Sequence, residues 1–383
     1  MLGRLERRML LDVPWGFIGV TAAIAALGVY NLVSASRPPN TPVWVAQAAY
    51  FVLGFVVMAV VSVIDIRVVQ RLTVPFYVVN IGLLIALKFI GHRAKGAESW
   101  FVLGPVRFQP AELMKIAMVL MLAKYFHDDY RPNDSRYGFM RLIPPVLLAG
   151  VPTVLVLAQP DLGTAMMMGL TLLTVLLFAR LKTSVWAVGV VAFGLVVGVI
   201  WNDYVRVQAE PRVTVVRQFL KKHQDGRISG WLDPTTDLKG TNYHSMQSKI
   251  AVGSGGLTGK GWKQGTQTGL RYLPEQHTDF IFSVWAEEHG FLACLLLLVL
   301  YGAFLTGALA VAFNARERFG VFVAVGLAAM VFWQIFENIG MVTGLLPVTG
   351  ITLPLLSYGG SSVLSMMIAV GLLINISMRR TVF

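Results

Sequence analysis

Residues 272–290 read YLPEQHTDFIFSVWAEEHG, with one carboxylate at the entrance of an apolar run and two more inside it. Asp279 ends a polar approach, and Glu287 and Glu288 follow about two helical turns later inside the apolar run. A carboxylate placed where a helix meets water can act as a general base or can cap the helix. Asp279 also closes a long polar loop, which favours the catalytic interpretation, whereas structural roles are favoured for the two glutamates.

Further ionisable side chains lie inside or beside other apolar stretches. Glu112 and Lys115 are three residues apart, so they share one face of a helix that could start at Pro110. Ionisable groups inside a membrane segment are functional candidates by default, and for this pair a coupling role and a structural ion pair are both open. Asp161 is expected to cap a helix, and a structural role is favoured for Glu337.

The composition indicates a membrane protein. Hydrophobic residues make up 56% and charged residues 14% of the 383 residues, whereas a soluble domain carries about 25% charged residues. Apolar runs of roughly 17–25 residues are long enough to cross a bilayer, and continuous runs of this kind select helices rather than a barrel. The predicted fold class is therefore an all-α polytopic membrane protein, with residues 1–383 forming a single integral membrane domain.

Ten apolar runs are candidate transmembrane helices. They cover residues 15–34, 43–64, 73–90, 110–126, 142–158, 162–179, 184–201, 280–313, 320–345 and 361–376. The eighth run is too long for one simple span, because it would extend about 51 Å at 1.5 Å per residue. Counting back about 20 residues from Phe313 leaves Asp279 to about Gly290 above the hydrocarbon or lining a protein cavity.

The distribution of Lys and Arg predicts the orientation. One set of short loops and both ends of the chain carry most of these residues, while the opposite short loops are poor in them. The positive-inside rule places the rich set and both termini in the cytoplasm. The formal net charge of +12 then arises mostly from the basic residues of the cytoplasmic loops. A nucleic-acid partner is not expected, because the basic residues form no single face.

One long segment, residues 202–278, connects the seventh and eighth runs and is predicted to be extracytoplasmic. Residues 211–223 fit a basic amphipathic helix, which could lie at the membrane surface or pack on the protein's own loops. Residues 242–252 are predicted to form a short helix. Seven glycines follow between Gly253 and Gly269, a density that lets the backbone approach a ligand closely.

The sequence lacks the patterns of several common kinds of site. Gly259 and Lys260 do not belong to a phosphate-binding loop, because a serine stands where the first glycine should be and a glycine follows the lysine. The six histidines show no zinc spacing, and no GxSxG element occurs. The single cysteine, Cys294, lies in an apolar run, so disulfides are not expected.

Four motifs follow one another along the chain. They read WFVLGPVRFQPAELMK, AQPDLGTA, NYHSMQSKIAVGSGGLTGKGWKQGTQTGLRYLPEQHTDFIFSVWAEEHG and LPVTGITLPLLSYGGSS. Together, and in this order, they resemble the SEDS family (shape, elongation, division, sporulation) of bacterial cell-wall polymerases over essentially the whole chain. The resemblance is strongest to the elongation branch, and the essential acid of the family, in its HTDF element, maps onto Asp279.

The resemblance implies a peptidoglycan glycosyltransferase of the bacterial inner membrane that polymerises lipid II outside the cytoplasm during elongation and rod-shape maintenance. Attack of the GlcNAc 4-hydroxyl on the MurNAc anomeric carbon changes an α into a β linkage. One inverting displacement with Asp279 as general base is therefore the economical mechanism. The leaving undecaprenyl diphosphate needs positive charge, and the candidates for binding it or the sugars are Lys249, Lys260, Arg206, Arg271, Gln247 and His277.

The resemblance also implies cofactors and partners, and it leaves alternatives. A divalent cation, Mg²⁺ or Mn²⁺, could assist, with Asp279 as a ligand, and no organic cofactor is expected. The implied partners are a class B penicillin-binding protein and other membrane proteins of the elongation complex. A lipid II flippase and a non-catalytic scaffold for the penicillin-binding protein are the alternatives. A flippase would depend most on midplane groups along a pathway, and a scaffold would not need Asp279.

Overall fold

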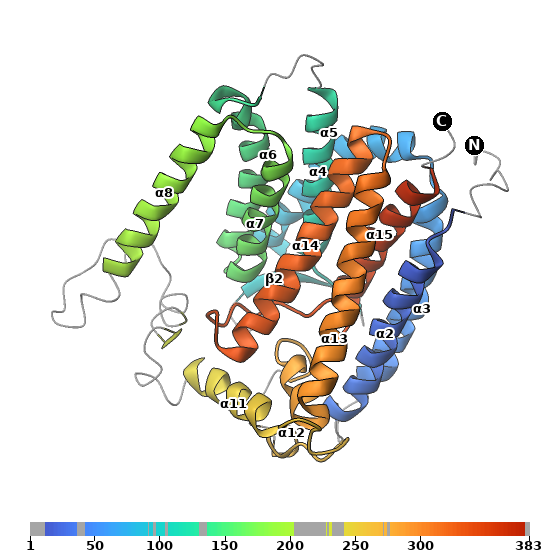
Figure 1. Cartoon of the computed structure of the whole chain (residues 1–383), viewed down its shortest axis with the longest axis vertical. Helices are drawn as coiled ribbons and strands as arrows, with labels where there is room; N and C mark the ends of the chain where they lie inside the picture. The colour runs from blue at the N-terminus through green and yellow to red at the C-terminus, as the bar shows by residue number, and fades with distance from the viewer. Residues whose placement is uncertain are drawn as a thin grey trace.

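The computed structural model describes residues 12–36, 43–90, 92–94, 97–103, 106–129, 136–202, 227, 230–231, 241–270, 272–273 and 276–379. Within these residues the chain forms a bundle of long helices with shorter helices at one end (Figure 1), and it also contains a small sheet. The predicted all-α polytopic class is confirmed, with the small sheet as an addition that the sequence analysis did not predict.

Ten long helices coincide with the ten apolar runs. They are α2 (Trp15–Ala35), α3 (Val43–Val63), α4 (Ile66–Ile90), α5 (Pro110–Asp128), α6 (Phe139–Ala158), α7 (Leu162–Phe178), α8 (Thr183–Trp201), α13 (Ile281–Asn314), α14 (Arg318–Thr343) and α15 (Gly360–Met378). The largest difference is at the start of α4, which begins at Ile66 although the apolar run begins at Thr73. Its first turns carry Arg67 and Arg71, and hydropathy marks only the lipid-facing part of such a helix.

Among the described residues, seven of these helices are long and apolar enough to cross a membrane. Of the remaining three, α7 and α8 are shorter apolar helices, and α5 carries a buried ion pair. Because α5 and α7 both pack against α14, we propose that they span the membrane beside it, as the sequence analysis expects.

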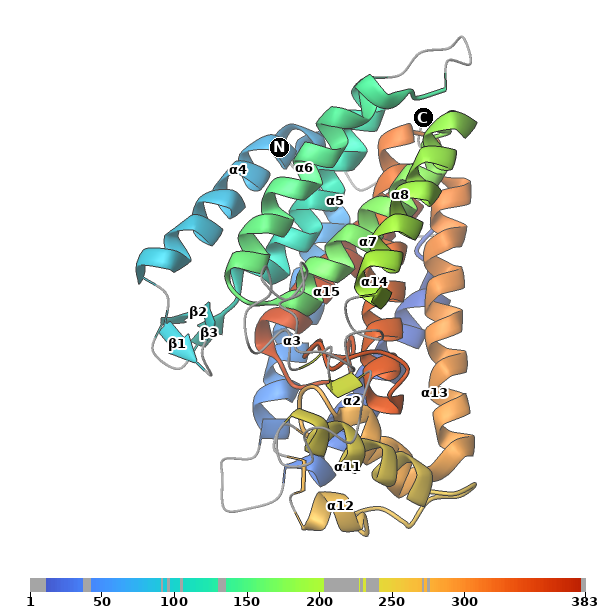
Figure 2. The ribbon, with the colours of Figure 1, turned by 90° about the vertical axis from the view of Figure 1, so that its left-hand side faces the viewer.

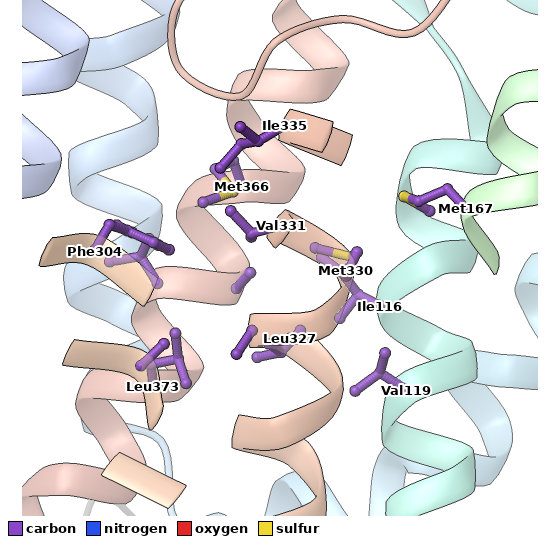
Figure 3. Packing of buried hydrophobic residues seen from close by; sticks show 14 of the residues in the cluster. Ile116, Val119, Met167, Phe304, Leu327, Met330, Val331, Ile335, Met366 and Leu373 are labelled. Atoms are coloured by element: carbon purple, nitrogen blue, oxygen red, sulfur yellow. The ribbon is translucent and has the colours of Figure 1, made fainter. Parts of the chain in front are cut away.

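α14 forms the centre of the bundle, since it packs against α5, α7 and α13. Figure 3 shows Leu327, Met330 and Val331 of this helix between Ile116 of α5 and Phe304 of α13. All five side chains are almost completely buried. Lipid tails are as apolar as these side chains, so close packing rather than a hydrophobic driving force holds such helices together.

α8 stands apart from the rest of the bundle in Figure 1. Many apolar side chains of α8 are exposed in the described part of the structure, among them Val191, Phe193 and Leu195. Inside a bilayer these side chains can face lipid directly, so their exposure is no liability.

A three-stranded antiparallel sheet connects α4 and α5. Its strands are β1 (His92–Ala94), β2 (Ala97–Leu103) and β3 (Val106–Phe108), in the order β1-β2-β3. In the pairing of β2 with β3, Phe101 lies opposite Phe108. Figure 2 shows the sheet at the side of the bundle, at the end of α4. Strands as short as three residues carry too little alternation for a periodicity argument to detect them.

α13 is interrupted at Gly290, whose φ of 73° and ψ of −171° divide the helix into residues 281–289 and 291–314. The second part extends about 36 Å, which is enough to cross the hydrocarbon core. The stretch before Gly290 is thus separate from the simple span, as the count of residues predicts. α11 (Thr241–Ser254), which confirms the predicted short helix, and α12 (Thr266–Gly269) lie at the same end (Figure 1). The helix predicted at 211–223 lies outside the described residues.

Candidate active site

Asp279 lies in a turn, residues 276–280, that leads directly into α13. The helix begins at Ile281, its N-cap residue is Phe280, and no side chain caps it. Asp279 is therefore not the N-cap residue of α13. The Asp279 side chain is partly exposed, and its Oδ2 lies 3.4 Å from the position that a Cβ on Gly350 would occupy. Its carboxylate thus faces the connection between α14 and α15.

A buried amide on α14 holds the backbone of this turn. The Nδ2 of Asn338 donates one hydrogen bond to the carbonyl of Asp279, at 2.9 Å, and another to the carbonyl of Ile351, at 2.6 Å. Asn338 is completely buried, so the two carbonyls have little access to water that could replace it. One side chain therefore fixes the Asp279 turn and the α14–α15 connection relative to each other.

The connection itself supplies two more donors to the same turn. Ser357 Oγ donates to the carbonyl of Thr278 at 2.7 Å, and the Tyr358 N–H donates to the carbonyl of His277 at 2.9 Å. The His277 and Tyr358 rings are also in contact, with centroids 5.9 Å apart. Burial raises the pKa of the Tyr358 hydroxyl above its ordinary value. These bonds use backbone carbonyls as acceptors, so the Asp279 turn is fixed through its main chain.

α2 holds the two flanks of the turn. The Nδ2 of Asn31 donates to the carbonyl of Ile281 at 3.1 Å. The Nε2 of Gln276, at the other flank, donates to the carbonyl of Ala35 at 2.9 Å. Three separate parts of the chain therefore converge on the residues around Asp279, which preorganises its position.

Two basic side chains lie beside the connection that Asp279 faces. Lys249 of α11 packs against Gly344 at the end of α14, where a Cβ would collide with the lysine side chain. The Nη1 of Arg227 donates to the carbonyl of Thr349 at 3.1 Å, one residue before the glycine that faces Asp279. Residues 344–350 are thus surrounded by one carboxylate and two cations.

Sequence reasoning named Lys249 as a candidate but missed Arg227. Arg227 is one of several basic residues in the long loop, and nothing in its immediate neighbours distinguishes it from the others. Gln247 is half-buried on α11. The candidates Arg206 and Arg271 lie outside the described residues.

Glu287 anchors the glycine-rich loop, which confirms the structural role favoured for it. Its side chain is completely buried. Oε1 accepts hydrogen bonds from Lys260 Nζ at 2.7 Å and from the N–H groups of Thr266 and Gln267 at 2.8 and 3.0 Å. Oε2 accepts from the N–H and hydroxyl of Thr268 at 3.3 and 3.2 Å. Lys260, a predicted diphosphate ligand, is thus paired with Glu287 in the structure.

The glycines of this loop allow a close approach to the protein's own helix. A Cβ on Gly255 would collide with the carbonyl of Ala286, and one on Gly259 would collide with the carbonyl of Glu288. Gly259 also has a φ of 81°, which a side chain would strain. A Cβ on Gly290, at the break in α13, would meet the backbone N of Gly259. Gly255 and Gly259 thus admit the interrupted helix, whereas nothing lies within 4 Å of a Cβ on Gly253 or Gly256, and the approach of a ligand stays a prediction.

Glu288 is directed toward α2 and is almost completely buried. Ser34 Oγ of α2 donates to its Oε1 at 2.5 Å. The loop reaches the same helix, because Trp262 stacks on Tyr30 with ring centroids 5.4 Å apart. The first part of α13, the glycine-rich loop and α2 therefore form one support beneath the Asp279 turn.

A second group of ionisable side chains is buried inside the bundle. Lys115 Nζ lies 2.9 Å from both carboxylate oxygens of Glu112, and Ser365 of α15 donates to Glu112 Oε2 at 2.8 Å. The predicted pair on one face of α5 is thus present. Asp161 Oδ1 accepts from the N–H of Thr164 at 3.0 Å, so Asp161 caps α7 as predicted.

Glu337 belongs to this buried group, which the sequence did not predict. It is completely buried in α14, and neither carboxylate oxygen has a hydrogen-bond partner among the described residues. It interacts electrostatically with Asp161 and Lys115. Three carboxylates and one ammonium from α5, α7 and α14 therefore meet in the interior, separate from the Asp279 turn.

Within the described part of the chain, no three His, Cys, Asp or Glu side chains come together so as to hold a metal ion.

Comparisons with known proteins agree with this architecture. The model of the FtsW, RodA and SpoVE family, described as cell cycle proteins, matches residues 8–382. The chain is 41% identical over 328 residues to the peptidoglycan glycosyltransferase MrdB of Escherichia coli strain K12, which covers 86% of this chain and 84% of that protein.

Two solved structures are similar over almost the whole chain. The rod shape determining protein RodA of Thermus thermophilus matches with a TM-score of 0.68 and 30% identity, covering 96% of this chain and 98% of that chain. A chain from a structure on the coordination of polymerization and crosslinking by a peptidoglycan synthase complex matches with a TM-score of 0.79, 31% identity and the same coverage.

Proposed function

Since the chain belongs to the FtsW, RodA and SpoVE family of cell cycle proteins, we propose that it polymerises lipid II into β-1,4 glycan strands during cell elongation. Like its relatives in this family, it is a peptidoglycan glycosyltransferase. The proposal of an elongation and rod-shape role is supported by the similarity to a protein named as rod shape determining and by the motifs of the glycine-rich loop.

The proposed mechanism is a single inverting displacement with Asp279 as general base. The Asp279 carboxylate accepts the proton of the GlcNAc 4-hydroxyl while that oxygen forms a bond to the MurNAc anomeric carbon. The bond from this carbon to the diphosphate breaks, and undecaprenyl diphosphate leaves with the electron pair. The observation that carries this assignment is the geometry of the turn. Its backbone is fixed by Asn338, Ser357 and Asn31, while the N-cap position of α13 belongs to Phe280.

The leaving diphosphate requires cations near Asp279. Lys249 and Arg227 meet this requirement in the proposed site, because both lie against residues 344–350, which Asp279 also faces. Lys260 fits it less well, because its ammonium group is held by Glu287 and Thr266. We therefore propose Lys249 and Arg227 as the principal diphosphate ligands, with Gln247 and His277 nearer the sugars.

A divalent cation, Mg²⁺ or Mn²⁺, is part of the proposal only as an ion shared with the substrate. Asp279 would supply one carboxylate, and the diphosphate would supply further oxygens. The ion would reduce the negative charge on the leaving group, and the proton transfer to Asp279 does not depend on it.

The proposed topology places the Asp279 turn and residues 202–278 outside the cytoplasmic membrane and both termini inside. Basic residues gather at the opposite end of the bundle, where α4 and α14 begin, at Arg67, Arg71 and Arg318, as the positive-inside rule requires. The proposed partner is a class B penicillin-binding protein, which would crosslink the strands. It is supported by the similarity to a chain of a peptidoglycan synthase complex.

One observation favours the flippase alternative. Glu112, Lys115, Asp161 and Glu337 form a buried group inside the helices, as a transport pathway for a charged lipid would need. The two functions make opposite demands, because polymerisation needs Asp279 and transport needs the buried group.

A polymerisation assay on the purified protein with its penicillin-binding partner and labelled lipid II tests the proposal. Asp279→Asn keeps the size of the side chain and removes its basicity, so glycan synthesis should fall by about 10²-fold or more. Asp128→Asn serves as the matched control, because Asp128 is an exposed carboxylate at the other end of the bundle. Wild-type synthesis by Asp279→Asn would eliminate the catalytic assignment and favour transport.

A further inference from the structure

A cavity of about 910 Å³ opens at the end of the bundle that lies away from Asp279. Five cationic side chains and one carboxylate are among the residues that line it: Arg67, Arg71, Lys124, Arg316, Arg318 and Glu317. Arg318 is the first residue of α14, whereas Asn338, which holds the Asp279 turn, lies about 30 Å further along that helix. The cavity is therefore separate from the proposed catalytic site.

The cations come from three separate parts of the chain. Arg67 and Arg71 lie one turn apart at the start of α4, and Lys124 lies near the end of α5. Arg316 lies in the connection between α13 and α14, and Arg318 is the first residue of α14. The positive-inside rule accounts for basic residues at this end of the bundle. It does not require three segments to direct them at one cavity, where like charges repel.

Among the described residues that line the cavity, cations outnumber carboxylates. Glu317 is the carboxylate in the lining, and Asp128 lies 3.1 Å from Lys124 as its ion-pair partner. Asp65, also outside the lining, accepts a hydrogen bond from the Arg67 N–H at 2.9 Å, so one lining carboxylate stands against five lining cations. Arg and Lys in this arrangement are the usual ligands of phosphate oxygens. The volume is also in the range of sites that bind small molecules or headgroups.

Two exposed apolar side chains that follow the lining arginines along α4, without lining the cavity themselves, indicate which phosphate compound fits. Val68 and Leu72 alternate with Arg67 and Arg71 along the start of α4, and they are 41% and 55% exposed. In a helix that crosses a membrane, such side chains face acyl chains, while Arg and Lys extend toward the headgroup region. A ligand that touches both surfaces carries a phosphate and fatty acyl chains.

We propose that this cavity is a binding site for the headgroup of an anionic glycerophospholipid, with phosphodiester oxygens held by Arg71 and Arg316 and acyl chains along Val68 and Leu72. The site joins the start of α4, the end of α5 and the α13–α14 connection through one lipid. Basic pockets between helices at this side of a membrane have the chemistry to hold lipids with one or two phosphates.

Titration of the purified full-length protein with phosphatidylglycerol and with cardiolipin, followed by native mass spectrometry, tests this site. The wild type should bind both lipids in preference to phosphatidylcholine with the same acyl chains. The double variant Arg71→Gln/Arg316→Gln should bind them about 25-fold more weakly, since each cation near an anionic lipid contributes about 5-fold. Affinity equal to that of the wild type would overturn the proposal.

The matched control removes the same charge at the same end of the bundle. Arg136 and Arg141 flank the start of α6 and do not line the cavity. The variant Arg136→Gln/Arg141→Gln should keep the affinity within about 2-fold of the wild type, because neither side chain lines the cavity and so neither contacts a headgroup bound inside it. An equal loss in this variant would show that net charge alone attracts the lipid, and the site would be rejected.

Two further measurements complete the test. If Arg71→Gln/Arg316→Gln lacks a cooperative melting transition, the single variants replace it, each with an expected loss of about 5-fold, and unchanged binding in both would reject the site.

Inorganic phosphate at about 10 mM, above the millimolar dissociation constant of a weak site, should leave the lipid bound. Displacement of the lipid by phosphate would assign the cavity to a soluble anion and overturn the lipid proposal.

Discussion

Asp279 and Glu287 are eight residues apart in one motif, yet the structure surrounds them in opposite ways. Glu287 is completely buried and its two oxygens accept hydrogen bonds from Lys260, two side-chain hydroxyls and three backbone N–H groups. Asp279 is partly exposed, and the identified bonds to its turn go to backbone carbonyls. A carboxylate that is buried among hydrogen-bond donors holds the loop in place, whereas a partly exposed carboxylate on a fixed backbone, directed at Gly350, is placed for chemistry.

The largest expected effects separate these two carboxylates. Asp279→Ala should abolish polymerisation with little change in melting temperature, because no helix cap is lost. Glu287→Ala should lower stability by about 3–5 kcal/mol, because it leaves Lys260 and several loop N–H groups without their acceptor. Thermal unfolding in detergent, run beside the lipid II assay, measures both quantities. The comparison fails if Asp279→Ala destabilises the protein as much as Glu287→Ala does.

The double-mutant cycle with Lys260 sharpens the same point. If Lys260 is mainly a partner of Glu287, then Lys260→Met combined with Glu287→Gln should cost less stability than the two single changes added together. A loss of polymerisation in Lys260→Met with unchanged melting temperature would instead return Lys260 to the diphosphate site.

The buried pair on α5 should behave like Glu287 rather than like Asp279. Glu112→Ala or Lys115→Ala leaves one charge buried without its partner, at a cost of about 3–5 kcal/mol. The double variant Glu112→Gln/Lys115→Met should be more stable than either single variant. Melting temperatures of the three proteins test this, and wild-type stability and activity in both single variants would make the pair incidental.

Asn338 should have an intermediate effect, because it acts on Asp279 through the backbone. Asn338→Ala leaves the carbonyls of Asp279 and Ile351 without their donor, which costs about 1–3 kcal/mol. If the bond positions Asp279, kcat should fall while KM for lipid II changes little. Asn338→Asp keeps the shape but places an acceptor-only carboxylate against the two carbonyls, so it should lose at least as much stability and kcat as Asn338→Ala. A variant with lower stability but unchanged kcat would reduce Asn338 to a structural role.

The elements of this fold follow from the sequence because hydropathy in a membrane is a strong signal. Ten apolar runs became ten helices, and the interruption of the eighth near Gly290 followed from its length. The sheet between α4 and α5 could not be predicted from the sequence, because its strands are too short to show an alternating pattern of apolar residues. The start of α4 was placed late because charged residues occupy its first turns.

The site was predictable in part. Asp279 came from the motif and from its place at the end of a polar loop. The partners that fix it, Asn338 on α14 and Asn31 on α2, come from far along the chain, and an apolar helix with one amide gives no sign of its target. The interaction of Glu337 with Asp161 and Lys115 could not be predicted for the same reason. The order of the helices in the sequence does not tell which helix faces pack against one another.

The smallest expected effect concerns Asp161, which tests whether a capping carboxylate also serves the buried group. Its Oδ1 caps α7 through the Thr164 N–H, and its Oδ2 accepts from Gln109 Nε2 at 3.3 Å. As a cap alone, Asp161→Asn should be nearly neutral, and Asp161→Ala should cost about 1 kcal/mol. Asn keeps the acceptor but removes the negative charge near Lys115, so the two variants separate capping from charge. Equal melting temperatures for Asp161→Asn and the wild type, with a lower value for Asp161→Ala, confirm the cap. A loss in Asp161→Asn that disappears when Lys115 is also replaced by Met would show that the charge matters, and Asp161 would then belong with Glu112 and Glu337.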